Sequence, residues 1–341
     1  MSNPLGLVGI EFVEFCSNDT DYLHDLFLEF GFSLLAKHTS KEIFYYKQND
    51  IHFLLNKEKE NFADSFQKAH GPSICSMGWR MKDSKLALEQ AIERGAKSGE
   101  GDYESLKSIS GIGDSLIYFV DNFEDESRYE KLGFKTLENP IISPNKGFIA
   151  IDHLTNNVNN GEMEKWANFY KEIFGFTEVR YFDIKGAKTG LISYALQAPN
   201  RSFCIPINEG TDKKSQINEY LEEYNGPGVQ HLAFITHDIV KSLETLKSTK
   251  IETLDIDDQY YEEVFDRVPG VTEDPKVLQE HQILVDGDKL GYLLQIFTRN
   301  IIGPIFIEII QRKNHFSFGE GNFGALFRSI ERDQEKRGYL K

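Results

Sequence analysis

The sequence predicts an α+β protein of two domains, each built from tandem βαβββ modules that form an open, curved, mixed sheet around a cavity. Three observations support this prediction. A strand followed by a helix that ends at a glycine occurs once in each half of the chain, and a second strand–helix unit also recurs. The 341 residues are sufficient for two hydrophobic cores. We expect domains at residues 1–140 and 147–341.

The first repeated unit starts with predicted strands at residues 9–12 and 150–153. A helix is expected from Tyr22 to Phe30 in the first copy and from about Met163 to Phe174 in the second. A glycine follows each helix, at positions 31 and 175, which is typical of a left-handed C-cap. The sequence at residues 132–134 repeats this signature.

The second repeated unit is a strand followed directly by a helix. Residues 76–83 precede a helix that reaches about Arg94, and residues 231–238 precede one that reaches about Thr249. Between the two halves, the polar stretch from Asn139 to Lys146 contains two prolines and is the expected linker.

Three apolar, strand-like runs in the C-terminal half each contain one potential metal ligand: His153, His231 and Glu308. A lone histidine on an apolar strand face is more often a hydrogen-bonded core residue than a ligand. Glu308 favours the interpretation as metal ligands, because an ionised carboxylate in such an apolar run is costly to bury without a cation. Two imidazoles and one carboxylate form the ligand set of a non-haem Fe(II) site with open coordination positions.

The N-terminal half has the same architecture without these ligands. Phe12 and Ser76 stand where the C-terminal half has His153 and His231, and the late strand at residues 116–120 has no carboxylate. We therefore expect the N-terminal domain to be structural or oligomeric, and the C-terminal domain to carry the site.

Composition argues against several functional classes. The 38 Lys and Arg against 54 Asp and Glu give a net charge of −16, which disfavours binding to nucleic acids and to anionic membranes. No run approaches the roughly 18 apolar residues of a transmembrane helix, and the start of the sequence lacks the pattern of a signal peptide. Cys16, Cys75 and Cys204 are too few and too far apart for a disulfide framework. We expect a reduced, cytoplasmic protein.

Several motifs resemble the 4-hydroxyphenylpyruvate dioxygenase family, within the vicinal-oxygen-chelate superfamily of glyoxalase-like folds. They are Asp152-His153, Lys214-Ser215-Gln216-Ile217, Asn225-Gly226-Pro227-Gly228-Val229-Gln230-His231, Gly291-Tyr292-Leu293-Leu294-Gln295-Ile296-Phe297-Thr298, residues 306–312 and Phe318-Gly319-Glu320-Gly321-Asn322-Phe323. The motifs lie within about residues 147–335, and the N-terminal half is less similar. Ser317 departs from the family's usual glycine, and the loop from Asn208 to Gln216 is short.

The resemblance implies that His153, His231 and Glu308 bind Fe(II) as the cofactor. It also implies the following substrate pocket: Ser193, Asn208, Gln216, Gln230, Gln295, Phe306, Phe318, Asn322 and Phe323. The implied reaction converts 4-hydroxyphenylpyruvate and O2 to homogentisate and CO2, a step of tyrosine catabolism. We expect a homo-oligomer, either a dimer or a tetramer.

A C-terminal helix is predicted from about Asn322 to Glu331, and its apolar stripe would close the cavity mouth as in the family. The stripe consists of Phe323, Leu326, Phe327 and Ile330. Asn322 is the expected N-cap, and the glycines at positions 319 and 321 are the expected hinge.

Other functions stay open from the sequence. Hydroxymandelate synthase shares the three ligands and the substrate but oxidises the benzylic carbon, and retention of Pro206 and Asn208 favours the dioxygenase. Ring-cleaving extradiol dioxygenases share the three ligands but lack a counterpart of Gln295 and of the motif at residues 319–323. A non-catalytic binding protein of the superfamily would not need all three ligands. Some bacterial family members are named haemolysins, which we attribute to pigment from autoxidised homogentisate.

Overall fold

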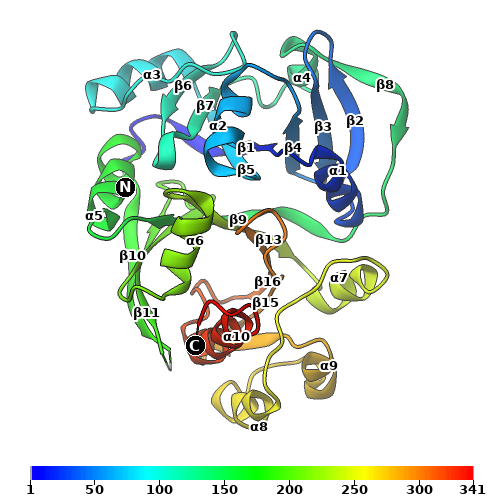
Figure 1. The fold of residues 1–341 in the computed structure, drawn as a ribbon, viewed down its shortest axis with the longest axis vertical. Coiled ribbons are helices and arrows are strands. Elements are labelled where there is room, and N and C mark those ends of the chain that lie inside the picture. The colour runs from blue at the N-terminus through cyan, green and yellow to red at the C-terminus, as the bar shows by residue number, and fades with distance from the viewer. Residues whose placement is uncertain (1, 187, 341) are drawn as a thin grey trace.

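Two eight-stranded mixed sheets, one in each half of the chain, form the framework of the protein (Figure 1). The computed structural model describes residues 2–186 and 188–340. In spatial order, the first sheet consists of β6 (Lys107–Ser110), β7 (Leu116–Val120), β5 (Ser73–Met81), β1 (Leu7–Cys16), β4 (Ile51–Asn56), β3 (Ile43–Gln48), β2 (Ser33–His38) and β8 (Phe134–Ile141). The second consists of β10 (Thr177–Lys185), β11 (Gly190–Gln197), β12 (Cys204–Gly210), β9 (Phe148–Val158), β13 (Gly228–Thr236), β16 (Phe306–Lys313), β15 (Tyr292–Phe297) and β14 (Leu284–Gly287). The predicted fold class is confirmed.

Helices connect the strands and cover the sheets. They are α1 (Thr20–Glu29), α2 (Phe62–His70), α3 (Ser84–Glu93), α4 (Arg128–Lys131), α5 (Met163–Phe169), α6 (Gln216–Tyr224), α7 (Ile239–Leu246), α8 (Asp258–Arg267), α9 (Pro275–Glu280) and α10 (Phe323–Lys336), with short turns η1 (Ile112–Asp114), η2 (Tyr170–Phe174) and η3 (Glu320–Asn322). Among the helices of the described residues, none has the length and apolarity that crossing a bilayer requires.

Both repeated strand–helix units are present, with small differences from the prediction. The helix that starts at Met163 changes at Tyr170 into a π-helical turn, and the helix after β13 ends at Leu246 instead of about Thr249. Gly175 adopts the left-handed conformation (φ 78°) expected of the residue that ends this helix, and its N–H donates to the Lys171 carbonyl.

The expected linker is partly strand. β8 reaches Ile141, which pairs with Leu34 of β2, so the polar stretch after Asn139 begins inside the first sheet. The chain crosses to the second sheet over residues 142–147, where the Lys146 N–H donates to Gln48 Oε1 at 2.8 Å. The expected domain boundaries at residues 140 and 147 stay predictions, and the outer ends at residues 1 and 341 lie outside the described residues.

The two sheets pack one face against each other through aromatic side chains. Phe234 of β13 lies 5.3 Å from Phe148, 6.0 Å from Phe32 and 6.0 Å from Phe53, measured between ring centroids. Successive residues of a strand point to opposite faces. Because Phe234 enters this shared core, its neighbour Ala233 and also His231 face the opposite side of the second sheet.

The corresponding face of the first sheet is filled with side chains. In the second sheet, His153 and Glu308 lie opposite each other on either side of Ala233 in one row of paired residues. The equivalent row of the first sheet has Phe12 and Tyr118 on either side of Gly78. The Phe12 ring packs against Tyr118 at 6.1 Å and would overlap any side chain at Gly78, whose Cβ would lie 2.4 Å from it. Aromatic rings therefore occupy in the first sheet the positions of potential ligands in the second.

Beside these rings, a buried carboxylate is satisfied by neutral donors. Glu14 is completely buried and accepts hydrogen bonds from the Ser76 hydroxyl at 2.5 Å, the Tyr103 hydroxyl at 2.7 Å and the Asn56 amide at 2.9 Å. Burial raises the pKa of Glu14 to about 7 although these hydrogen bonds act to lower it. The protonated form is therefore favoured in the folded protein below about pH 7.

We predict that Glu14→Gln stabilises the protein at pH 8 and leaves its stability at pH 5 almost unchanged. The folded pKa of Glu14 lies above its ordinary value of 4.5, so the stabilising effect of protonation is complete below pH 4.5 and is lost as the pH rises through 7. The loss is on the order of 3 kcal/mol, and Gln avoids it. Urea unfolding of both proteins at the two pH values provides the measurement.

Glu11→Gln serves as the control for this prediction. Glu11 is equally buried but accepts from Arg80 Nε at 2.7 Å and Arg128 Nε at 2.5 Å, so its removal should destabilise the protein at both pH values. A stability difference for Glu14→Gln that is the same at pH 5 and pH 8 would contradict the assignment.

Candidate metal centre and its cavity

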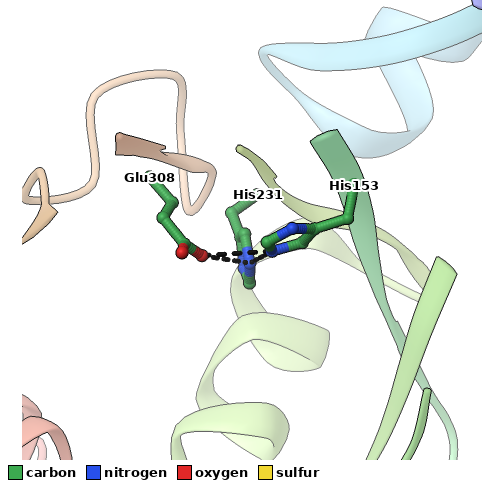
Figure 2. A group of neighbouring side chains, drawn as sticks. All are labelled: His153, His231 and Glu308. Carbon is green, nitrogen blue, oxygen red and sulfur yellow. Dashed lines mark hydrogen bonds and ion pairs between the residues drawn. The ribbon is translucent and has the colours of Figure 1, made fainter. Parts of the chain in front are cut away.

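Three side chains from adjacent strands converge on one point of the open face of the second sheet (Figure 2). His153 Nε2 lies 3.1 Å from Glu308 Oε2, and His231 Nε2 lies 3.4 Å from both of these atoms. First-row divalent metals bind such donors at roughly 2.1 Å, so neighbouring donors of an octahedral set lie about 3 Å apart. The spacing of the three donors therefore fits a single divalent metal.

Hydrogen bonds orient both imidazoles toward this point. The Asp152 carboxylate, which can only accept, lies 2.8 Å from His153 Nδ1, so the proton of that ring is on Nδ1. His231 Nδ1 donates in the same way to Gln230 Oε1 at 3.0 Å. Each Nε2 can then present its lone pair to a metal, and such outer partners are typical of metal-binding histidines.

The electrostatics of the three side chains require a positive charge between them. Burial raises the pKa of Glu308, but the neighbouring His153 outweighs this effect and holds the pKa at about 2. Burial lowers the pKa of His153, but Glu308 and Asp152 raise it to about 9. A proton on His153 supplies the cation when no metal is bound, and a divalent metal would replace that proton.

One arginine connects the histidine to the wall of the cavity. Arg312 donates to both oxygens of Asp152, at 2.8 and 2.7 Å, and also to the carbonyls of His315 at 3.1 Å and Ser317 at 2.7 Å. These contacts fix the segment that leads to Phe318, whose ring packs edge-on against His153 at 5.6 Å. Arg312 thus positions a potential ligand and a wall residue together.

The three donors open into a cavity, a concave and largely apolar site of the kind that binds small molecules. Of the predicted pocket residues, the following line it: Ser193, Asn208, Gln216, Gln230, Gln295, Phe306, Phe318 and Phe323. The walls are mainly apolar, and the amides and hydroxyl provide a few hydrogen-bonding groups.

Asn322 differs from the prediction in two respects. Its side chain is completely buried behind Gln295 and does not line the cavity. It also does not cap α10, because its backbone is helical (φ −97°, ψ −13°) and its side-chain oxygen accepts from Tyr260 and Arg267 instead. Asn322 is thus the residue directly before α10, as expected, but its side chain makes no capping hydrogen bond because its oxygen is engaged elsewhere.

Helix α10 forms one side of the cavity through Phe323, Leu326, Phe327 and Ile330. It extends to Lys336, beyond the predicted end at Glu331. Glu331 accepts hydrogen bonds from the Thr189 N–H at 3.0 Å and the Thr189 hydroxyl at 3.1 Å. The helix is therefore fixed to the segment between β10 and β11.

Sequence reasoning missed further cavity residues: Thr155, Phe182, Ile184, Leu191 and Phe297. Strand alternation could have found some of them, because Thr155 lies two positions after His153 on the same strand face. The roles of Asp152 and Arg312 were missed because alternation predicts that Asp152 faces away from the site. An acidic residue directly before a candidate ligand histidine was the available signal.

We predict that Asp152→Asn weakens divalent metal binding 10- to 100-fold while the fold is retained, because His153 loses the carboxylate that orients it. Competition with a chelating dye under nitrogen would measure the dissociation constant. The exposed residue Asp288 provides the control, since Asp288→Asn should leave metal affinity unchanged. Equal affinities of Asp152→Asn and the unmodified protein would contradict the role of Asp152.

Two family models match the chain. The model described as "Hydroxyphenylpyruvate dioxygenase, HPPD, N-terminal" matches residues 1–135, and "Glyoxalase/Bleomycin resistance protein/Dioxygenase superfamily" matches residues 150–276. The two matches fall on the two sheets separately.

Known relatives match over almost the whole chain. Protein MelA of Shewanella colwelliana is 61% identical and covers 99% of both chains. Hemolysin VllY of Vibrio vulnificus is 46% identical over 99% of this chain and 98% of its own. The 4-hydroxyphenylpyruvate dioxygenase of Legionella pneumophila strain Corby is 45% identical over 100% of this chain and 98% of its own.

Solved structures share the fold. A fusion of a xylose isomerase-like TIM barrel with 4-hydroxyphenylpyruvate dioxygenase has a TM-score of 0.83 and 27% identity; the match covers 98% of this chain and 54% of the fusion protein. A mutant of 4-hydroxymandelate synthase from Streptomyces coelicolor also has a TM-score of 0.83, with 24% identity over 96% of this chain and 99% of its own. At that identity the similarity shows the fold alone.

Proposed function

The chain belongs to the 4-hydroxyphenylpyruvate dioxygenase family, and we propose that it uses Fe(II) to convert 4-hydroxyphenylpyruvate and O2 to homogentisate and CO2. The observation that carries the proposal is the convergence of His153, His231 and Glu308 at the base of an apolar cavity. These two imidazoles and one carboxylate would hold the metal and would leave it able to bind both an α-keto acid and O2.

The metal, when bound, supplies the redox chemistry with O2, and the chain supplies binding, orientation and exclusion of water. Phe306, Phe318 and Phe323 form an apolar wall that suits an aromatic ring. Gln216, Gln230 and Asn208 all line the cavity, where amides can hydrogen-bond to substrate oxygens, and Asn208 Nδ2 donates to Gln230 Oε1 at 3.4 Å. The nine substrate-pocket residues inferred from the resemblance remain part of this proposal, with Asn322 acting from behind Gln295.

Hydroxymandelate synthase is the alternative on the same substrate, since a mutant of that enzyme shares the fold. Pro206 and Asn208 favour the dioxygenase, and both lie at the cavity surface. We propose anaerobic reconstitution with Fe(II), addition of 4-hydroxyphenylpyruvate and O2, and identification of the product. Homogentisate is expected, whereas hydroxymandelate would support the alternative. An intact substrate would support a non-catalytic binding protein.

Each of His153→Ala, His231→Ala and Glu308→Ala is predicted to abolish turnover, because each removes one of the three protein donors. The fold should persist, which circular dichroism would check. His237→Ala is the matched control, because this histidine is exposed at the end of β13 and should be dispensable. Turnover close to that of the unmodified protein in any of the three variants, with metal bound, would refute the ligand assignment.

Zn(II) is predicted to bind the centre and inhibit, and Fe(II) is predicted to support activity. Zinc binds such donors more tightly than ferrous iron but has no redox chemistry with O2. The measurement compares metal-free protein loaded with each metal and assayed for homogentisate. Full activity with zinc alone would contradict an oxygenase.

We propose that α10 gates the cavity and keeps it dry during reaction. Glu331→Ala removes the contacts that hold the helix to Thr189, so water should reach the site more often. The predicted result is that O2 uptake exceeds homogentisate formation when both are measured in parallel. A one-to-one ratio at a normal rate would show that these contacts serve packing alone.

We further propose a cytoplasmic protein that acts as a homo-oligomer, a dimer or a tetramer. Its unbridged cysteines Cys16, Cys75 and Cys204 fit a reducing compartment. The net charge of −16 is unfavourable for nucleic acids and for anionic lipid surfaces. Sedimentation equilibrium would determine the oligomeric state.

A further inference from the structure

A chain of hydrogen bonds leads from the surface helix α8 to the cavity. Asn322 lies at its centre and is completely buried. Its Oδ1 accepts from Arg267 Nη2 at 3.1 Å and from the Tyr260 hydroxyl at 2.7 Å. Its Nδ2 donates to Oε1 of Gln295 at 3.3 Å. Gln295 is 2% exposed and lines the cavity.

Arg267 fixes the direction of this chain because a guanidinium can only donate. The Tyr260 hydroxyl can donate or accept, so it would tolerate either orientation of the Asn322 amide. Arg267 tolerates one orientation, in which Oδ1 faces the guanidinium and Nδ2 faces Gln295. The Arg267 guanidinium therefore determines which end of the buried Asn322 amide faces Gln295.

The guanidinium is itself held in place. Arg267 Nη1 donates to Asp286 Oδ1 at 3.2 Å and Nη2 to the Val285 carbonyl at 3.0 Å. The Gly321 N–H donates to the other oxygen of Asp286 at 3.0 Å. A Cβ at Gly321 would lie 1.4 Å from Arg267 Nη1, so the guanidinium occupies space that only glycine leaves free.

The orientation of the Asn322 amide in turn determines the orientation of the Gln295 amide. Because its Oε1 accepts from Asn322, its Nε2 is the atom that can donate into the cavity. A Cβ at Gly319 would lie 1.9 Å from Gln295 Oε1, which shows how closely the loop before α10 confines this amide. The cavity thus offers an N–H donor at Gln295 and not a carbonyl acceptor.

We propose that Arg267 is a positioning residue that acts through Asn322 to turn the N–H of Gln295 toward an acceptor oxygen of the substrate. The inference rests on the proposed function for its substrate class, an aromatic α-keto acid, whose carboxylate, keto and phenolic oxygens can all accept. A reversed Gln295 amide would place its oxygen against a carboxylate or keto oxygen, neither of which can donate. The substrate would then lose a hydrogen bond and meet an unsatisfied buried acceptor.

The test measures the dissociation constant of 4-hydroxyphenylpyruvate under nitrogen with the full-length, Fe(II)-loaded protein. Asn322→Asp keeps the shape of the side chain but replaces its donor nitrogen with a second acceptor oxygen. Gln295 must then turn its Nε2 toward the new carboxylate. We expect affinity to fall tenfold or more in Asn322→Asp and in Arg267→Leu. Arg267→Lys retains a donor-only cation and should recover most of the affinity.

Arg328→Leu is the matched control. Arg328 lines one surface groove together with Arg267, but it pairs with Asp257 and has no hydrogen bond to Asn322. We expect it to bind substrate as tightly as the unmodified protein, with iron content and melting temperature unchanged. Affinities within threefold of the unmodified protein in both Asn322→Asp and Arg267→Leu would overturn the proposal. An equal loss of affinity in Arg328→Leu would also overturn it, because local packing would then explain the effect.

A second measurement does not depend on the substrate. In protein labelled with ¹⁵N-glutamine, the side-chain signal of Gln295 is assigned by its absence in Gln295→Glu. We expect this signal to move downfield in Asn322→Asp, where Nε2 gains a carboxylate acceptor, and an unchanged signal would overturn the proposed polarity. If the unmodified protein neither binds nor converts 4-hydroxyphenylpyruvate, the proposed function fails, while this spectrum still decides the orientation of Gln295.

Discussion

The burial of Glu308 in the middle of an apolar strand is the constraint that organises the C-terminal half. Glu308 is 3% exposed and lies between Ile307 and Ile309, where an unpaired charge would be costly. The two imidazoles that face it come from the two strands next along the sheet, so the order β9–β13–β16 is required to assemble the group. Asp152 and Gln230 orient the two imidazoles toward this carboxylate, and Arg312 holds Asp152 in place.

The two sheets show two ways to bury a carboxylate in the same architecture. In the first sheet, Glu14 accepts from hydroxyl and amide groups, and burial raises its pKa to about 7. In the second, His153 holds the pKa of Glu308 at about 2, so the group stays ionised. Within the packed core, burial outweighs the neutral donors and favours the protonated acid. Imidazoles keep a charged acid at the surface of a cavity, and this is the arrangement that can take a metal.

The fold class and the positions of the candidate ligands could be predicted from the sequence because both depend on local patterns. Strand alternation and glycine after helices repeat along the chain, and Glu308 is conspicuous in an apolar run. The pairing of Ile141 with Leu34 joins distant segments, and the π-helical turn after Phe169 packs against Trp79; no local pattern records such contacts. The true contacts of Asn322 belong to the same class, because Tyr260 and Arg267 come from a helix far away in sequence.

We propose that His153, His231 and Glu308 together hold one iron ion. X-ray diffraction at the iron absorption edge, from crystals grown anaerobically with Fe(II), would locate that ion. We expect one anomalous peak per chain, bonded to Nε2 of both histidines and to the Glu308 carboxylate. A peak elsewhere on the chain, with these three side chains still hydrogen-bonded to one another, would contradict it.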